Sequence, residues 1–152
     1  MKTIGIRVQP SEVTFVVFDA AENALVNVET IKIPKALAVP DALKYVRNNI
    51  LDVLNEYDVE CGGLRVTESN SQQKNIRRIE LEGVIQEAFA SSTLRAYYCG
   101  QISNISAKVG IPRTDFKLLV DGEKDFDQVE GWDELDREAR EATLAAIGAR
   151  SA

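Results

Sequence analysis

The side-chain inventory of this 152-residue chain limits the chemistry it could perform. The chain contains no histidine, which excludes a Ser-His-Asp triad, a Cys-His pair, an HExxH zinc site and an imidazole general base. Its 24 aspartates and glutamates leave another chemistry open, because clustered carboxylates can hold divalent metal ions that activate water.

The acidic residues are unevenly placed along the chain. Residues 113–141 hold 11 acidic and 5 basic residues, a net charge of −6 that equals the formal charge of the whole chain. This balance disfavours indiscriminate binding to nucleic acid or to anionic membranes, which needs a basic surface. An acidic segment of this kind is typical of a solvated face, and it would also suit a partner with a basic surface.

Three basic residues are the candidates for binding nucleic acid. Lys74, Arg77 and Arg78 are spaced i, i+3 and i+4, so they share one face of a predicted helix and could form a local phosphate-binding stripe. The same residues would equally form a solvated face paired with Glu80 or Glu82, since no aromatic residues are interleaved with them.

The first third of the chain predicts strands. Apolar runs over 4–8, 13–19 and 24–34 are separated by short turn-forming stretches, which indicates an antiparallel meander. A helical apolar stripe then follows Pro40 as far as Tyr57.

The remainder predicts parallel strands and a closing helix. A strand over 64–68, a helix from the polar stretch 69–73 to about residue 90, and a strand over 93–99 form a βαβ unit. Residues 100–132 show no clear period and predict an irregular acidic segment near 112–131, before a last helix that starts near Asp133. We therefore expect one domain over 1–152, of α/β class, with a mixed five-stranded sheet flanked by helices.

This order of elements resembles the ribonuclease H-like fold and, within it, the RuvC-type Holliday junction resolvases. Residues 3–8 resemble the family's first strand, and residues 64–69 resemble its fourth strand, which ends in a catalytic glutamate. Residues 79–85 resemble the small-residue-containing helix that follows, and residues 133–139 are similar to the start of the last helix, which carries the family's final acids.

The resemblance implies a site of four acids that holds two divalent metal ions and cleaves a phosphodiester. Carried over to this sequence, Glu68 matches the acid of the fourth strand, and Asp133 or Asp136 could match the acids of the last helix. Arg7, however, stands where the family has the acid of the first strand. Alternatively, Glu68 is half of an ion pair or a helix cap, and Asp133 and Asp136 offset the dipole of the last helix.

Arg7 argues against metal binding at this position. Replacing an aspartate with an arginine changes the local charge by two units, and each unit interaction at about 4 Å is worth about 4 kcal/mol at an effective dielectric constant of ~20. Because strands one and four are neighbours in this fold, we predict an ion pair between Arg7 and Glu68 where the metals would lie.

The sequence therefore favours a catalytically silent, RuvC-like module that needs no cofactor and binds a protein partner or structured nucleic acid. A nuclease dependent on Mg²⁺ or Mn²⁺ that uses Glu68, Asp133 and Asp136 is the alternative, and a structural subunit of a homodimer is a second. The N-terminus has no apolar stretch of signal-peptide length, and no apolar run could span a bilayer, so we expect a cytoplasmic location without membrane association.

Overall fold

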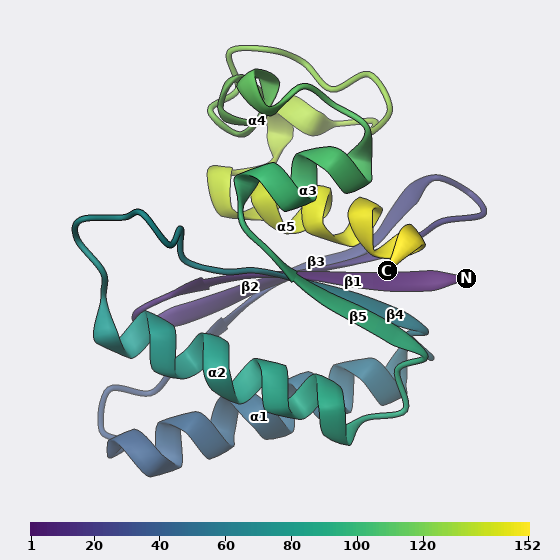
Figure 1. The fold of residues 1–152 in the computed structure, drawn as a ribbon. Helices are drawn as coiled ribbons and strands as arrows, with labels where there is room; N and C mark the ends of the chain where they lie inside the picture. Colours follow the sequence, from purple (N-terminus) through teal and green to yellow (C-terminus); the bar gives the residue numbers. More distant parts are fainter.

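A computed structural model describes residues 1–152 as one mixed five-stranded sheet with helices on both faces (Figure 1). The strand order is β3-β2-β1-β4-β5. The first three strands form the predicted antiparallel meander, whereas β4 is parallel to β1 and β5 is parallel to β4. The strands are β1 (Lys2–Gln9), β2 (Glu12–Asp19), β3 (Ala24–Lys32), β4 (Cys61–Arg65) and β5 (Ala96–Gly100).

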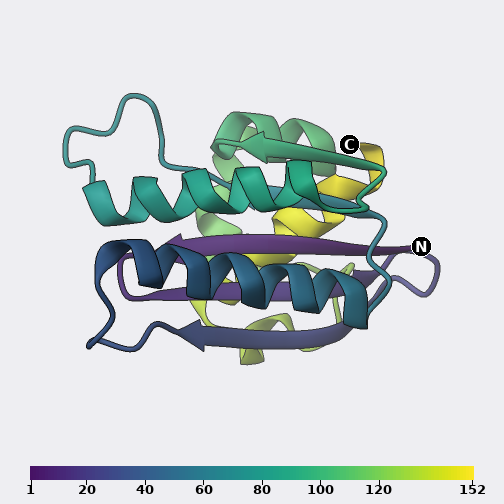
Figure 2. The same ribbon diagram turned by 90° about the horizontal axis from the view of Figure 1, so that it is seen from below.

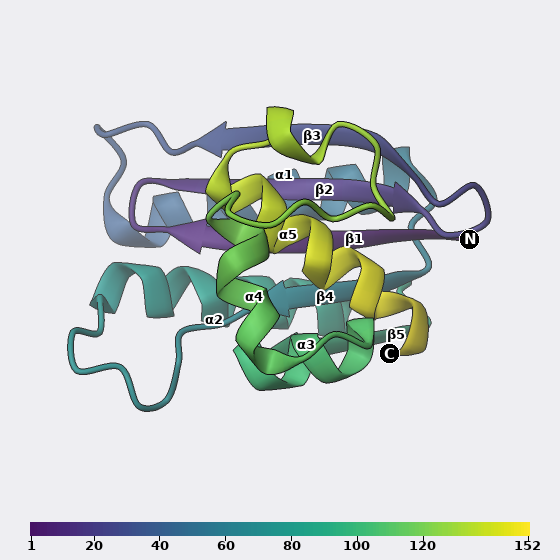
Figure 3. The same ribbon diagram turned by 90° about the horizontal axis from the view of Figure 1, so that it is seen from above.

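Two groups of helices cover the sheet. One face carries α1 (Val39–Glu56) and α2 (Ile76–Ser91), which lie side by side in Figure 2. The opposite face carries α3 (Ile102–Val109), α4 (Arg113–Val120) and α5 (Arg137–Gly148), as Figure 3 shows. Short 3-10 turns η1 (Trp132–Glu134) and η2 (Ala149–Ser151) flank α5. The predicted fold class and order of strands are confirmed, and no helix is long and apolar enough to cross a membrane.

Strand alternation divides the core into two halves. On β1, Ile4 and Ile6 are fully buried beneath α1 and α2. Thr3, Gly5 and Arg7 point to the other face, where α5 lies. This face has its own apolar cluster, in which Trp132 is buried and donates its indole N–H to the carbonyl of Leu119 at 2.9 Å.

Helix α5 lies unusually close to the sheet because two strand positions are glycines. A Cβ on Gly5 would overlap the carbonyl oxygen of Ala142, and a Cβ on Gly63 would lie 2.5 Å from the carbonyl oxygen of Ala145. Further along, the Thr3 hydroxyl donates to the carbonyl of Ala146 at 2.7 Å. The helix therefore runs antiparallel to β1, and its first turns lie at the carboxyl end of that strand.

The prediction of an irregular segment over 100–132 was wrong in part. Helices α3 and α4 occupy about half of it, whereas residues 101, 110–112 and 121–131 lack a regular element. Each helix has eight residues, too few turns for a period to show, and Gly110 ends the first of them in the left-handed conformation with φ 86°.

Two predicted boundaries also differ from the structure. The last helix begins at Arg137 rather than near Asp133, because Asp133 lies in η1. Strand β4 ends at Arg65, so Glu68 lies three residues beyond the strand rather than at its end.

Candidate functional site

The carboxyl ends of β1 and β4 carry two arginines, Arg7 and Arg65, and Arg7 stands where the resemblance implies a carboxylate. Arg7 and Arg65 are register partners in the parallel ladder between these strands. Glu141 of α5 lies between them, with its side chain only 2% exposed. The Nε of Arg7 donates to Glu141 Oε2, and the Nε of Arg65 lies 3.3 Å from Glu141 Oε1. Each oxygen of this carboxylate therefore has a guanidinium partner.

Glu68 pairs with the second of these arginines. Its Oε2 lies 2.8 Å from Nη1 of Arg65 and also accepts the backbone N–H of Ile102, the first residue of α3, at 2.9 Å. The predicted ion pair between Arg7 and Glu68 was therefore wrong in its partners. Glu68, three residues beyond the end of β4, contacts the first residue of α3, whereas Glu141 of α5 contacts Arg7.

A fourth ion pair, between Arg78 and Glu82, lies beside the segment that follows β4. Glu82 of α2 is buried, and its carboxylate lies 2.8 Å from the Nε of Arg78. The same carboxylate accepts the backbone N–H of Thr67 at 3.1 Å and the Thr67 hydroxyl at 3.0 Å. Through these hydrogen bonds, Glu82 connects Thr67, two residues beyond β4, to α2.

The three arginines lie close enough to influence one another. Burial and the charges of Arg7 and Arg65 lower the pKa of the Arg78 guanidinium, against the raising effect of Glu82. One nitrogen of this guanidinium, Nη2, is buried without a hydrogen-bond partner. Six residues make up this arginine–glutamate cluster, three of each charge: Arg7, Arg65, Arg78, Glu68, Glu82 and Glu141.

The ionisation of Glu141 shows how strongly the cluster is coupled. Burial raises the pKa of the Glu141 carboxyl, but the charges of Arg7 and Arg65 and the hydrogen bond from Arg7 lower it. The net result is a pKa below the ordinary value for a glutamate, so Glu141 is ionised at neutral pH.

These residues do not fit the two-metal centre that the resemblance implies. Both oxygens of Glu141 are taken by guanidinium groups, and the Oε2 of Glu68 is taken by Arg65 and the N–H of Ile102. No group of three or more cysteine, aspartate or glutamate side chains converges in a way that could hold a metal ion. Two guanidinium groups therefore lie at the position where the resemblance implies anionic ligands for two dications.

The structure does not bring the two predicted aspartates to this cluster. Asp133 lies in η1, beside Glu22 and Asn23 near the start of β3. Asp136 caps α5, where its carboxylate accepts the backbone N–H of Ala139 at 2.8 Å. Asp136 therefore fits the alternative role of stabilising the start of the last helix, whereas Asp133 lies in η1, outside that helix.

Glu138 and Glu141 are the acids of α5 that face the sheet, and sequence reasoning missed them. Glu138 accepts a hydrogen bond from the amide of Gln9 at 3.1 Å, and Glu141 pairs with Arg7. The helical spacing could have indicated them. Glu138 and Glu141 lie on the same face of the helix as the small residues Ala142 and Ala145, which pack against the sheet.

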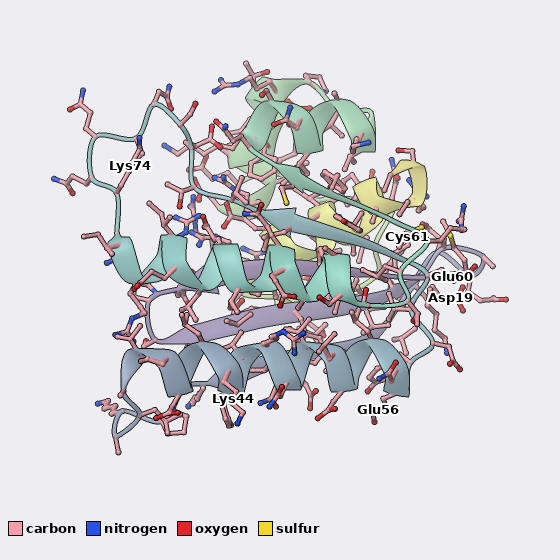
Figure 4. All side chains as sticks on the ribbon, turned by 60° about the horizontal axis from the view of Figure 1, so that its bottom comes forward. Asp19, Lys44, Glu56, Glu60, Cys61 and Lys74 are labelled. Carbon is pink, nitrogen blue, oxygen red and sulfur yellow. The ribbon has the colours of Figure 1, made fainter.

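The three candidate nucleic-acid-binding residues do not form one exposed stripe. Lys74 makes no ion pair and lies on the loop before α2, which projects from the body of the protein in Figure 4. Arg77 lies 3.6 Å from Glu80, and Arg78 turns inward to Glu82. Only Lys74 and Arg77 therefore belong to the surface.

Comparison with solved structures places this architecture in the ribonuclease H-like fold of the Holliday junction resolvases. Thermus thermophilus RuvC, solved with a Holliday junction substrate, has a TM-score of 0.73 at 13% identity over 97% of this chain and 92% of that chain. The yeast mitochondrial Holliday junction resolvase has a TM-score of 0.60 at 11% identity, over 96% of this chain and 76% of that chain.

The fowlpox virus resolvase, solved with Holliday junction DNA, has a TM-score of 0.52 at 13% identity, over 99% of this chain and 98% of that chain. No protein-family model and no curated protein matches the sequence. At identities of 11 to 13%, the likeness is one of fold.

Proposed function

We propose that this chain is a catalytically silent, RuvC-like module that binds structured nucleic acid or a protein partner without cleaving a phosphodiester. The observation that carries the proposal is the position of Glu141, whose two carboxylate oxygens are paired with Arg7 and Arg65 at the ends of β1 and β4.

The energetics favour binding without cleavage. Two-metal hydrolysis needs several free anionic oxygens in one pocket, and the guanidinium groups of Arg7 and Arg65 instead neutralise the acids that are present. Admitting a dication would require breaking buried ion pairs and leaving charges without partners, which costs several kcal/mol for each pair. With no histidine in the chain, there is also no imidazole to act as a general base.

The fold neighbours make branched DNA the first ligand to test. Two of them were solved with Holliday junction DNA bound. In this chain, Lys74 and Arg77 are the surface cations of α2 and its preceding loop. The acidic residues of 113–141 favour a protein partner with a basic surface as the other candidate.

A cleavage assay tests the proposal. The chain is incubated with a labelled four-way DNA junction in Mg²⁺ or Mn²⁺, with Thermus thermophilus RuvC as the positive control. We expect no metal-dependent cleavage and no difference between the wild type and Glu68→Gln. Cleavage that depends on the metal and is lost in Glu68→Gln would instead establish the nuclease alternative.

A binding assay with the same junction identifies the ligand class. If structured nucleic acid is the partner, the double variant Lys74→Glu, Arg77→Glu weakens junction binding and reduces its salt dependence. The control is Lys117→Glu, which makes a charge reversal on the exposed surface of α4. Equal binding by both variants would count against these two residues as the contact surface.

A second candidate function, a subunit of a homodimer, is favoured by the outer face of α2. Ile76 is 77% exposed and Ile79 is 42% exposed on this helix, and Tyr97 of the neighbouring β5 is 44% exposed. Gly83 lies in the middle of the helix, and a Cβ there would meet nothing within 4 Å. A mid-helix glycine costs about 1 kcal/mol relative to alanine, and no contact inside the chain requires it.

Sedimentation tests the homodimer. We expect the sedimentation coefficient to rise with protein concentration, and Ile79→Glu to abolish the rise. Leu118→Glu, at a site 39% exposed on α4, is the matched control. A wild-type chain that stays monomeric at all concentrations rules this candidate out.

A further inference from the structure

A groove runs between the edge strand β3 and helix α1, on the side of the molecule away from the α5 face. Its volume is about 530 Å³, within the range of sites that bind small molecules or short segments of chain. Four consecutive residues, 29–32, line one wall. A wall made of consecutive residues presents the backbone of the strand and not only alternate side chains.

The backbone of β3 is free to pair on its outer side. β3 is at the edge of the sheet and is paired only with β2. No backbone hydrogen bond joins residues 24–32 to any segment outside this pair. Figure 2 shows α1 running along β3 without covering its outer edge. An edge with free N–H and C=O groups can accept an additional extended strand.

The other wall of the groove is a face of α1 that combines apolar and acidic side chains. Tyr45 and Val53 supply apolar surface, and Asp52 and Glu56 supply carboxylates. Glu29 of β3 adds a third carboxylate from the opposite wall. None of these three acids forms an ion pair within the chain, although eight such pairs occur elsewhere. Lys32 also lines the groove, so its three carboxylates and one ammonium group leave a net charge of −2 that no ion pair within the chain neutralises.

The spacing of the acids matches that of an extended chain. Asp52 and Glu56 are one helical turn apart, a rise of about 6 Å along α1. Alternate residues of a β-strand point the same way and are about 6.6 Å apart. A strand lying along the groove with basic residues at two alternate positions would place one cation opposite each carboxylate.

We propose that this β3–α1 groove binds an extended segment of a partner protein, which adds a strand to β3 and directs lysine or arginine side chains at alternate positions toward Glu29, Asp52 and Glu56. The backbone pairing supplies affinity that is independent of sequence, and the carboxylates select for basic residues. The inference rests on the proposed function in one point, namely that the module binds a protein partner, and it adds the chemistry of that partner.

A selection experiment with the intact chain tests the inference. A randomised linear peptide library displayed on phage is panned against the wild-type protein, and the most enriched peptide is synthesised with a fluorescent label. We expect enriched sequences to carry lysine or arginine at alternate positions. We also expect amide hydrogen exchange in residues 27–31 to slow when the peptide binds, because strand addition protects outward-facing N–H groups.

Charge-reversal variants locate the site. Asp52→Lys, Glu56→Lys should weaken the peptide about tenfold or more, a change of about 1.4 kcal/mol. Both residues are exposed and unpaired, so folding should be retained, which circular dichroism checks. The matched control is Glu123→Lys, Glu130→Lys, which makes the same charge change at exposed positions outside the groove. A peptide with N-methylated backbone amides and the same side chains should not bind.

Three results would overturn the inference: selection without an alternating basic pattern, equal binding by the groove and control variants, or no protection of β3. None of them bears on the proposed absence of cleavage, since the groove shares no residue with the arginine–glutamate cluster. Junction cleavage by the wild type would, conversely, overturn the proposed function and leave peptide binding intact.

Discussion

Arg7 of β1 and Glu141 of α5 form an ion pair between residues 134 positions apart, at the place where the first strand meets the last helix. Arg65 of β4 shares the same carboxylate, so one glutamate joins the central strand β1 and its neighbour β4 to α5. The arrangement has the geometry of a site in which side chains from β1, β4 and the last helix converge. It differs from the two-metal site that the resemblance implies, because guanidinium groups and not metal ions supply the positive charge.

Glu141→Gln should destabilise the fold by about 3 kcal/mol or more. The substitution leaves Arg7 and Arg65 buried with no carboxylate between them, and breaking a buried pair by removing one partner typically costs about 3 to 5 kcal/mol. Urea denaturation measures the free energy of unfolding. Glu138→Gln is the matched control, with an expected loss of less than about 1 kcal/mol, because Glu138 bonds only to Gln9. Equal losses for the two variants would contradict a central role for Glu141.

The contribution of Glu141 should disappear in acid. A group with a lowered pKa in the folded state stabilises the protein above its unfolded pKa, here about 4.3, and loses that contribution as pH falls through the folded value. The stability difference between the wild type and Glu141→Gln should therefore be constant near neutrality and shrink below about pH 4.3. Denaturation curves at a series of pH values measure this difference. A difference that stays constant down to acid unfolding would mean that the Glu141 pKa is not lowered.

Glu82→Gln should loosen the segment that follows β4. The amide can still accept the hydrogen bonds of Thr67, but Arg78 loses its only ion pair while Arg7 and Arg65 remain nearby. We expect a loss of about 2 kcal/mol and faster amide hydrogen exchange over residues 66–75. Glu80→Gln removes the more exposed pair with Arg77 and should change stability by less than about 0.5 kcal/mol. Unchanged exchange in Glu82→Gln would show that this segment is held by other contacts.

The two halves of the sheet could be predicted from local signals, whereas the adjacency of β1 and β4 was predicted only from the resemblance to the ribonuclease H-like fold. The meander follows from apolar runs with short connections, and the βαβ unit follows from the alternation of strand and helix. Helices α3 and α4 were missed because a helix of eight residues shows little more than two turns of any pattern. Their stability comes from packing of Phe116 and Ile105 onto α5, which local sequence does not reveal.

The partners within the cluster were harder to predict than its location. The sequence placed Arg7 and Glu68 near each other, but which acid each arginine contacts depends on how closely α5 approaches the sheet. That approach is set by Gly5 and Gly63, whose importance appears only once the helix is docked. The same docking brings Glu141, rather than Asp133 or Asp136, over Arg7.

Gly5→Ala tests this docking directly. A Cβ at this position overlaps the backbone carbonyl of Ala142, so α5 must move outward and its ion pairs must lengthen. We expect a loss of about 3 kcal/mol, at the upper end of overpacking effects. Gly83→Ala is the matched control, and it should raise the stability by about 0.5 to 1 kcal/mol. A Cβ at Gly83 would meet nothing within 4 Å, and alanine favours a helix more than glycine does. Thermal denaturation at low protein concentration measures both, and similar stabilities would contradict the close approach of α5.

Arg7→Asp tests whether the Arg7 guanidinium excludes divalent cations. The substitution adds a carboxylate beside Glu141 and frees the Oε2 that Arg7 now occupies, so the variant should be less stable than the wild type in a metal-free buffer. Because ligand binding to the folded state raises its stability, Mn²⁺ should then raise the melting temperature of Arg7→Asp and leave that of the wild type unchanged. Arg7→Asn loses the same ion pair without adding a charge, and it should respond to Mn²⁺ no more than the wild type does. If Mn²⁺ stabilises the wild type as much as Arg7→Asp, the arginine is not what keeps cations out, and the proposed absence of metal-dependent cleavage loses its main support.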